Sequence, residues 1–243
     1  MTKITIISGG SGGLGFALAT RLLKEGKNII ILGRDSEKLV KAAEWLQTGL
    51  DYFRVTPVTC NIGNEKDVRK LGEYIKSQDL VVEFLFNNAG RGLFAKASTS
   101  TSEMIDDIFE ANIKGMILLT SEILKITPEE EELTIVNIMS TSSLYGRSDE
   151  TIYCAAKWGA RGYTEALRTE LKGTRRNIIA VYPGGMKTEF WKFPGHGRDI
   201  SQFMEPDDVA GKIVDAVLIK DGIIVTDITI NRKKYPPTPL KGV

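Results

Sequence analysis

The sequence predicts an α/β protein in which one parallel sheet carries helices on both faces. The first observation is that short apolar runs alternate with longer amphipathic segments along the 243 residues. Apolar runs too short for a helix indicate strands buried on both faces, and the segments between them have helical periodicity. The second observation is a glycine-rich turn, residues 8–15, between the first run and the first helical segment. The predicted strands are 4–7, 28–32, 53–59, 81–86, 133–139, 177–182 and a last one within 223–230.

The composition limits the classes of protein to consider. No linker divides the chain, so we expect residues 1–243 to form one domain. A net charge of +1 argues against nucleic-acid binding, and no apolar run approaches the roughly 18 residues of a membrane span. Met1 leads almost directly into a strand, so we expect no signal peptide. Cys60 and Cys154 are too few for a disulfide framework or a metal cluster, so we expect no metal ion and a cytoplasmic location.

The glycine turn has the form expected of a dinucleotide-binding site. Its glycines Gly9, Gly13 and Gly15 are spaced Gly-x-x-x-Gly-x-Gly between a strand and a helix. The N-terminus of a helix offers unpaired N–H groups to a pyrophosphate, and glycine lets the backbone approach it closely. The alternative is an ordinary turn that is rich in glycine. The turn favours a Rossmann-type, doubly wound parallel sheet. The expected cofactor contacts here are Gly9, Ser11, Gly12, Gly13, Leu14 and Gly15.

The end of the second strand bears on which dinucleotide binds. In this fold that strand end meets the adenosine ribose, where a carboxylate favours NAD. Here Gly33 stands at the strand end and Arg34 follows, and a guanidinium suits a 2′-phosphate. Asp35 is better explained as the N-cap of the helix predicted over 36–49. The sequence therefore predicts NADP(H) as the preferred cofactor and NAD(H) as the weaker one, unless Arg34 is merely a surface charge.

The third predicted strand supports the same topology. It contains Pro57, which has no N–H to donate and therefore favours the edge of a sheet. In the doubly wound strand order 3-2-1-4-5-6 the third strand is an edge. The proline and the glycine turn thus indicate one strand order from separate parts of the chain.

Polar residues stand at particular places in the later elements. The fourth strand is followed by Asn-Asn-Ala-Gly at 87–90, and amide side chains there can tie strand ends together. Asn112 lies inside the apolar helical segment 101–126, where asparagine has poor helix propensity. Ser140 directly follows the fifth strand. Each of these features alone has an ordinary structural explanation, such as a turn or a hydrogen bond to the backbone.

The fifth predicted helical segment, 153–171, completes a pattern. Tyr153 and Lys157 are four residues apart and share one face of this helix. Together with Ser140, Asn112, the Asn-Asn-Ala-Gly sequence and the glycine turn, in this order, they make the chain resemble the classical short-chain dehydrogenase/reductase family. The resemblance covers nearly the whole chain.

The resemblance implies a role for each member of this set. Hydride would pass between NADPH and a carbonyl carbon, and Tyr153 would donate a proton to the carbonyl oxygen. Ser140 would hydrogen-bond that oxygen, and Asn112 would position a water. Lys157 would hold the nicotinamide ribose and lower the pKa of the Tyr153 phenol, since a nearby cation favours phenolate. The implied activity is that of an NADP-preferring carbonyl reductase or alcohol dehydrogenase.

The resemblance also implies cofactor contacts beyond the glycine turn. The family usually carries aspartate, near the adenine, where Asn61 stands. This departure leaves the adenine contact open, although asparagine can donate and accept hydrogen bonds. The implied contacts are Asn61, Ile62, Asn88, Ala89, Gly90, Tyr153, Lys157, Pro183, Gly184, Met186 and Thr188.

The substrate is predicted to be a small carbonyl or hydroxyl compound. An aromatic and glycine-rich segment, about 186–206, is predicted to be a substrate lid. His196 lies within it, but we expect no acid–base role for this side chain because Tyr153 and Lys157 already supply one. The predicted substrate contacts are Ser140, Tyr153, Phe94, Leu144, Phe190 and Trp191.

Two other functions stay open at this point. One is a regulatory or scaffold protein that binds NADPH without turnover, and the other is an epimerase of the same fold. An intact Ser/Tyr/Lys set argues against the first, and the short region after Thr188 argues against the second. The resemblance further implies a homodimer or homotetramer formed through the helices near 101–126 and 153–172. The tail 233–239 is polar and rich in proline.

Overall fold

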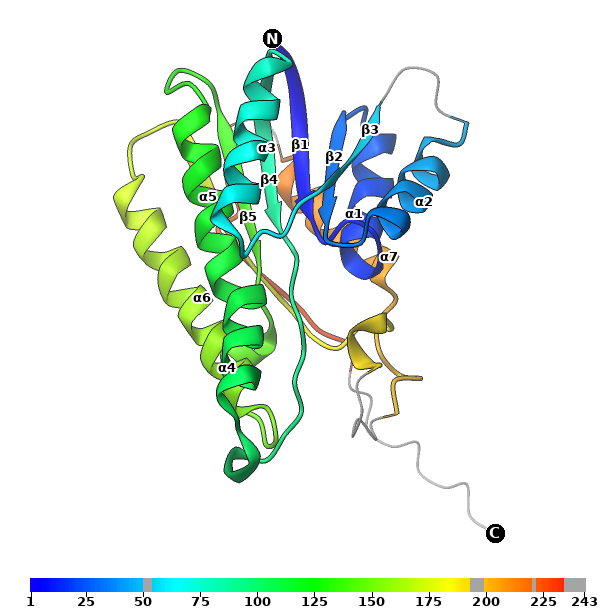
Figure 1. Ribbon diagram of the computed structural model, residues 1–243, viewed down its shortest axis with the longest axis vertical. Helices are drawn as coiled ribbons and strands as arrows, with labels where there is room; N and C mark the ends of the chain where they lie inside the picture. Colours follow the sequence, from blue (N-terminus) through cyan, green and yellow to red (C-terminus); the bar gives the residue numbers. More distant parts are fainter. Residues whose placement is uncertain (50–53, 193–198, 220–221, 234–243) are drawn as a thin grey trace.

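The computed structural model describes residues 1–49, 54–192, 199–219 and 222–233. Its centre is a parallel sheet with the strand order β3-β2-β1-β4-β5-β6-β7 (Figure 1). The predicted order 3-2-1-4-5-6 is confirmed, and β7 extends it at the far edge. The strands are β1 Thr2–Ser8, β2 Ile29–Gly33, β3 Val55–Thr59, β4 Leu80–Asn87, β5 Leu133–Ile138, β6 Arg176–Pro183 and β7 Asp227–Ile230.

Helices cover both faces of the sheet, as Figure 1 shows. They are α1 Gly13–Lys24, α2 Ser36–Gln47, α3 Glu65–Ser77, α4 Ser102–Phe109, α5 Gly115–Ile126, α6 Thr151–Glu170 and α7 Pro206–Val217. One apolar cluster joins α1, α2 and α7 to one face of the sheet. A second joins α3, α5 and α6 to the other face. Successive residues of a strand point to opposite faces, so Ile6 belongs to one cluster and Ile7 to the other.

Two local predictions from sequence are confirmed. Pro57 lies in β3 at the edge of the sheet. Proline is tolerated there because an edge strand has a neighbour on one side only, so a missing N–H need not cost a hydrogen bond between strands. Asp35 caps α2, since its side chain accepts a 3.0 Å hydrogen bond from the Lys38 N–H. The chain therefore enters its second helix directly after Arg34, at the end of β2.

The long helix predicted over 101–126 is confirmed, but it contains a π-helical turn. The segment begins as α4, passes through the π-helical turn Glu110–Lys114, and continues as α5. A π turn contains one more residue than an α turn, and such turns occur often at functional sites. Here the turn carries Asn112, which is buried.

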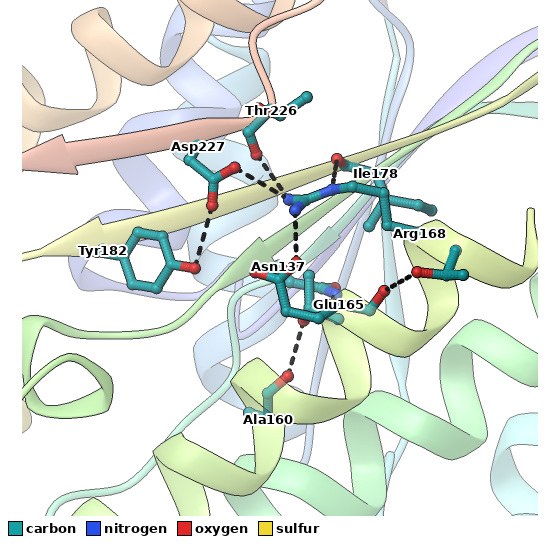
Figure 2. A network of polar contacts seen from close by, with 10 residues as sticks. Asn137, Ala160, Glu165, Arg168, Ile178, Tyr182, Thr226 and Asp227 are labelled. Atoms are coloured by element: carbon teal, nitrogen blue, oxygen red, sulfur yellow. Dashed lines mark hydrogen bonds and ion pairs between the residues drawn. The ribbon is translucent and has the colours of Figure 1, made fainter. Parts of the chain in front are cut away.

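Helix α6 is tied to the sheet by polar contacts that Figure 2 shows. Asn137 of β5 donates a 2.9 Å hydrogen bond to Thr164. Arg168 donates to the Thr226 carbonyl at 2.9 Å and pairs with Asp227 of β7 at 3.4 Å. These contacts fix the helix that carries Tyr153 and Lys157. Burial and the neighbouring Asp227 raise the pKa of Tyr182, also in this network, to about 12.

Some sequence predictions fall elsewhere or go untested. His196 and the tail from 234 onward lie outside the described residues. The third strand begins at Val55, because Arg54 is described and lies outside it, and the predicted first residue, 53, is outside the described residues. Within the part of the chain that the structure describes, no helix is both long and apolar enough to cross a membrane.

Candidate active site

A cavity of about 990 Å³ opens at the carboxyl ends of the strands. The glycine turn, the end of β4, the segment after β5, the start of α6 and the segment after β6 all contribute to its wall. In open α/β sheets ligands bind in this crevice, where the direction of the strand order reverses, here between β1 and β4. The fold thus gathers motifs that are far apart in the sequence.

The glycine turn leaves the start of α1 without a side-chain cap. Gly12 is the N-cap of α1 and makes no side-chain capping bond, and the first turn of the helix contains no acidic residue. Its N–H groups are thus uncompensated by a cap and line the cavity. Gly9 and Gly13 have positive φ angles of 68° and 52°. A Cβ on Gly15 would lie 2.2 Å from the Gly9 carbonyl oxygen, so only glycine fits there.

The Asn-Asn-Ala-Gly segment is fastened to this turn. The Ser8 hydroxyl accepts hydrogen bonds of 3.0 Å from the N–H groups of Asn88 and Ala89. The Asn88 amide donates back to the Ser8 carbonyl at 2.9 Å. Asn87 instead donates to Thr120 and Asn137 in the buried interior. Asn88 and Ala89 thus belong to the cavity wall, whereas Asn87 holds helix α5 to the sheet.

Asn112 is held in place by the backbone around it. Its amide donates to the carbonyls of Ile108 and Arg91 at 2.9 Å and 2.8 Å, and its oxygen accepts from the Arg91 N–H at 3.3 Å. A Cβ on Gly90 would lie 2.8 Å from the Asn112 oxygen and 3.5 Å from Lys157 Nζ. Asn112 therefore makes structural hydrogen bonds to the backbone and also lines the cavity, and its catalytic role stays a prediction.

Tyr153, Lys157 and Ser140 meet in the same wall. Lys157 Nζ donates to the Ile138 carbonyl at 3.2 Å and lies 5.9 Å from the centre of the Tyr153 ring. Burial lowers the pKa of Lys157 to about 8. Tyr153 is also buried and lines the cavity together with Ser140. The arrangement combines a phenol, a hydroxyl and an amine in a poorly hydrated pocket.

The groups around Tyr153 act on its pKa in opposite directions. Burial is the largest effect and raises the pKa of this phenol, and Ser140 opposes burial only in part. The phenol is therefore protonated at neutral pH. The lowering expected from a protonated Lys157 stays a prediction.

Aromatic rings close one side of the cavity. Phe190 lies 5.6 Å from the Tyr153 ring, and Trp191 lies 5.1 Å from Phe190 between ring centres. Phe94 stacks on Trp191 with 5.4 Å between ring centres, but it is not among the residues that line the cavity. Phe203, which the sequence did not single out as a substrate contact, does line the cavity. Leu144 packs in an apolar cluster beside Met139 and does not line the cavity.

The segment after β6 faces the glycine turn. Pro183, Gly184, Met186 and Thr188 all line the cavity. The Thr188 methyl would lie 3.3 Å from a Cβ placed on Gly13, which shows how closely the two loops approach. The two loops thus form opposite walls of one site.

The predicted adenine side lies apart from the cavity. Arg34 is exposed, and no hydrogen bond or ion pair to a described residue holds it. Ile62 is buried, and the Asn61 amide donates to Glu110 Oε1 at 3.2 Å. The Asn61 oxygen accepts from the Gly63 N–H at 3.2 Å. Both ends of this amide are therefore oriented by the protein itself.

Sequence reasoning missed five residues between Ser140 and Tyr153 that line the cavity, namely Thr141, Ser142, Tyr145, Arg147 and Glu150. Of these, Thr141, Ser142 and Glu150 are buried. Polar residues in a connecting segment look like solvated loop residues, so no periodicity marks them. The only signal was their position between two predicted catalytic groups.

Comparisons with known proteins show the family of this chain. The family model for short chain dehydrogenase matches residues 3–198. A short-chain dehydrogenase/reductase from Vibrio parahaemolyticus is 32% identical with a TM-score of 0.81, over 95% of this chain and 100% of that one. A sepiapterin reductase of Chlorobaculum tepidum is 27% identical over 95% of this chain and 96% of its own length. A variant actinorhodin polyketide ketoreductase, solved with NADPH, is 25% identical with a TM-score of 0.84, over 94% and 95% of the two chains. The chain belongs to the short-chain dehydrogenase family of oxidoreductases.

Proposed function

We propose that this chain is an NADP(H)-dependent oxidoreductase that interconverts a carbonyl compound and the corresponding alcohol, with Tyr153 as the acid and base. The observation that carries the proposal is that Ser140, Tyr153 and Lys157 line the wall of one cavity, in which Tyr153 and Lys157 are buried. The uncapped start of α1 opens into the same cavity. A proton donor and an anion site thus share one pocket.

The residues present fit a nicotinamide dinucleotide. The backbone of Ser11, Gly12 and Gly13 suits its pyrophosphate, because uncapped N–H groups at a helix N-terminus favour anions. Met186 and Thr188 on the facing loop, and Lys157, are assigned to the nicotinamide end by the family resemblance. When bound, the nicotinamide supplies or accepts the hydride.

The side chains of this chain supply the proton chemistry. Ser140 donates a hydrogen bond to the carbonyl oxygen and stabilises the negative charge that develops there. Tyr153, which lines the cavity beside Ser140, gives its proton to that oxygen. Lys157, when protonated, stabilises the phenolate that remains. Asn112 keeps the backbone at Arg91 in place beside this group.

Arg34 supports the preference for NADP(H). It is exposed at the end of β2, so its guanidinium is available to a 2′-phosphate, and Gly33 puts no carboxylate at the strand end. The ketoreductase that resembles this chain was solved with NADPH. Arg34 lies away from the proton-transfer groups, so the cofactor preference and the proton transfer can be tested separately.

The test of the activity is NADPH consumption with a panel of ketones, aldehydes and oxoacyl thioesters, followed by Tyr153→Phe. The variant keeps the ring and its packing, so NADPH binding should stay near the wild-type level while reduction is lost. If Tyr153→Phe kept more than about a tenth of the wild-type kcat, a factor worth about 1.4 kcal/mol, Tyr153 would not be the principal acid. NADPH binding without consumption by the wild type would favour a regulatory protein instead.

We also propose that the chain acts as a cytoplasmic homodimer or homotetramer that pairs through α4 and α6. Large apolar side chains are exposed on these helices, namely Ile105, Phe109 and Trp158. Contiguous exposed apolar residues often mark protein–protein contacts. Sedimentation at micromolar concentration tests the assembly, and a pure monomer would contradict it.

A further inference from the structure

The cavity wall contains a cation that the reaction described above does not use. Arg147 belongs to the segment between Ser140 and Tyr153, and its half-buried side chain lines the cavity. Its Nη2 donates to Thr141 Oγ1 at 3.0 Å and to the Tyr145 hydroxyl at 3.3 Å. The guanidinium also lies over the Tyr145 ring, 5.0 Å from the ring centre. The side chain is therefore held in position by neutral groups.

The charge of Arg147 has no counterion in this wall. Within the part of the chain that the structure describes, no ion pair joins Arg147 to a carboxylate, and no hydrogen bond uses the N–H groups of its Nε and Nη1. The carboxylates that line the cavity are each bound by another side chain, namely Glu150 by Ser142, Glu189 by Lys192 and Asp199 by Ser201. An oriented guanidinium with donors to spare is suited to bind an anion from outside the chain.

Arg147 lies close enough to reach a molecule bound at Ser140. Thr141 accepts a hydrogen bond from Arg147 and directly follows Ser140, and consecutive Cα atoms are about 3.8 Å apart. The guanidinium and the Ser140 hydroxyl are thus separated by a distance on the order of 10 Å at most, which one small molecule can span. The segment itself is fixed, since the Ala95 N–H donates to the Asp149 carbonyl at 2.8 Å.

The rest of the wall indicates what kind of molecule carries the anion. The rings of Phe190, Trp191 and Phe203 line the same cavity, and Phe190 lies 5.6 Å from the Tyr153 ring. Ligand sites combine apolar walls, which bind the body of a ligand, with a few polar groups that fix its orientation. The rings suit an apolar body, and the guanidinium suits a carboxylate at one end of it.

We propose that Arg147 binds a carboxylate of the substrate, so that the substrate is an oxo acid with an apolar body, or the corresponding hydroxy acid. The inference rests on the proposed function and names its substrate class. The carbonyl oxygen of the oxo acid meets Ser140 and Tyr153, and its carboxylate meets Nε and Nη1 of Arg147. Two polar anchors hold the carbonyl group in one orientation, which favours its reaction.

The test compares each oxo acid with its own methyl ester, because the ester removes the charge and keeps the ketone. Benzoylformate, benzoylacetate and 3-benzoylpropionate vary the spacing between the carbonyl group and the carboxylate. In the wild type, kcat/KM for the best acid should exceed that for its ester about tenfold or more, the effect of one charge-assisted hydrogen bond. Arg147→Gln should lose this preference and still reduce the ester, whereas Arg147→Lys, which keeps the charge, should retain part of it.

The matched control is Arg161→Gln. Arg161 donates to the Ser143 carbonyl at 3.4 Å, in the same segment, but it is not among the residues that line the cavity. This variant should keep the wild-type preference for the acid. A general disturbance of the segment would lower kcat/KM for acid and ester alike, so the ratio of the two values reports the charge alone. A wild type that reduces esters or neutral ketones as well as the acids would overturn the proposal, as would an unchanged ratio in Arg147→Gln.

A binding measurement without turnover separates this inference from the proposed function. Calorimetry with the NADP⁺-loaded protein would compare 3-phenylpropionate with 3-phenylpropionamide, neither of which has a ketone to reduce. The wild type and Arg161→Gln should bind the acid about tenfold more tightly than the amide, and Arg147→Gln should bind both alike. This outcome in a protein that reduces no carbonyl compound would reject the proposed function alone. Equal affinities in the wild type, or no binding of the acid, would refute the role of Arg147 whatever the activity.

Discussion

Replacing Gly90 by alanine tests whether Asn112 is held as tightly as its hydrogen bonds indicate. The new Cβ would lie 2.8 Å from the Asn112 oxygen, closer than carbon and oxygen can approach, so the amide must move. The movement would break its two bonds with Arg91, the 3.3 Å bond from the N–H and the 2.8 Å bond to the carbonyl. At about 1 kcal/mol for each bond, the free energy of unfolding should fall by about 2 kcal/mol.

The assay is thermal unfolding together with kcat. For a protein of this size a loss of about 2 kcal/mol lowers Tm by about 4–8 °C. The matched control is Gly162→Ala in α6, because a Cβ there meets nothing within 4 Å. Alanine is the better helix former, so this control should gain up to about 1 kcal/mol. Equal Tm values for Gly90→Ala and wild type, with kcat unchanged, would refute the reasoning about Asn112.

Three further predictions concern the cofactor, the buried lysine and the serine. Arg34→Ala should lower kcat/KM for NADPH about tenfold or more, with little change for NADH, because a charge-assisted hydrogen bond is worth about 1.5–3 kcal/mol. The control is Lys41→Ala, which removes an exposed cation of α2. Equal losses with both cofactors in Arg34→Ala would reject the assignment of Arg34 to the 2′-phosphate. The pKa of Lys157 falls from its ordinary 10.5 to about 8, so the unfolded chain binds more protons between these values and stability should rise with pH there. Lys157→Met should lack that rise in urea unfolding curves, and a rise retained in the variant would contradict the pKa assignment. Ser140→Ala should lower kcat/KM at least a hundredfold through loss of a preorganised donor, and an unchanged value would leave Ser140 a structural role.

The strand order was predictable because its signals are local. Buried strands appear as short apolar runs, and Pro57 marks the edge strand by the chemistry of its own backbone. The interruption between α4 and α5 was not predictable in the same way. One extra residue in a turn barely disturbs apolar periodicity, and only the unfavourable Asn112 in mid-helix gave a sign of it.

The candidate site was predictable in its members and less so in its electrostatics. Tyr153 and Lys157 stand out by their spacing, but the pKa of each depends on burial, which the fold decides. Glu150 and Ser142 also show that burial is not visible in the sequence. A polar loop and a buried hydrogen-bonded pair look alike in sequence, because desolvation comes from elements far along the chain.

The asparagine at position 61, which departs from the family's usual aspartate, is explained by its neighbour. Asn61 Nδ2 lies 3.2 Å from Glu110 Oε1 and donates to it. An aspartate would put a carboxylate oxygen in that place, and two like charges at such a distance repel. The Glu110 side chain has no room to move away from residue 61, because it packs closely on Gly63, where a Cβ would lie 2.3 Å from Glu110 Cγ. Glu110 and Asn112 share one π-helical turn, so the amide beside the predicted adenine site and the proposed catalytic asparagine are held by the same piece of backbone.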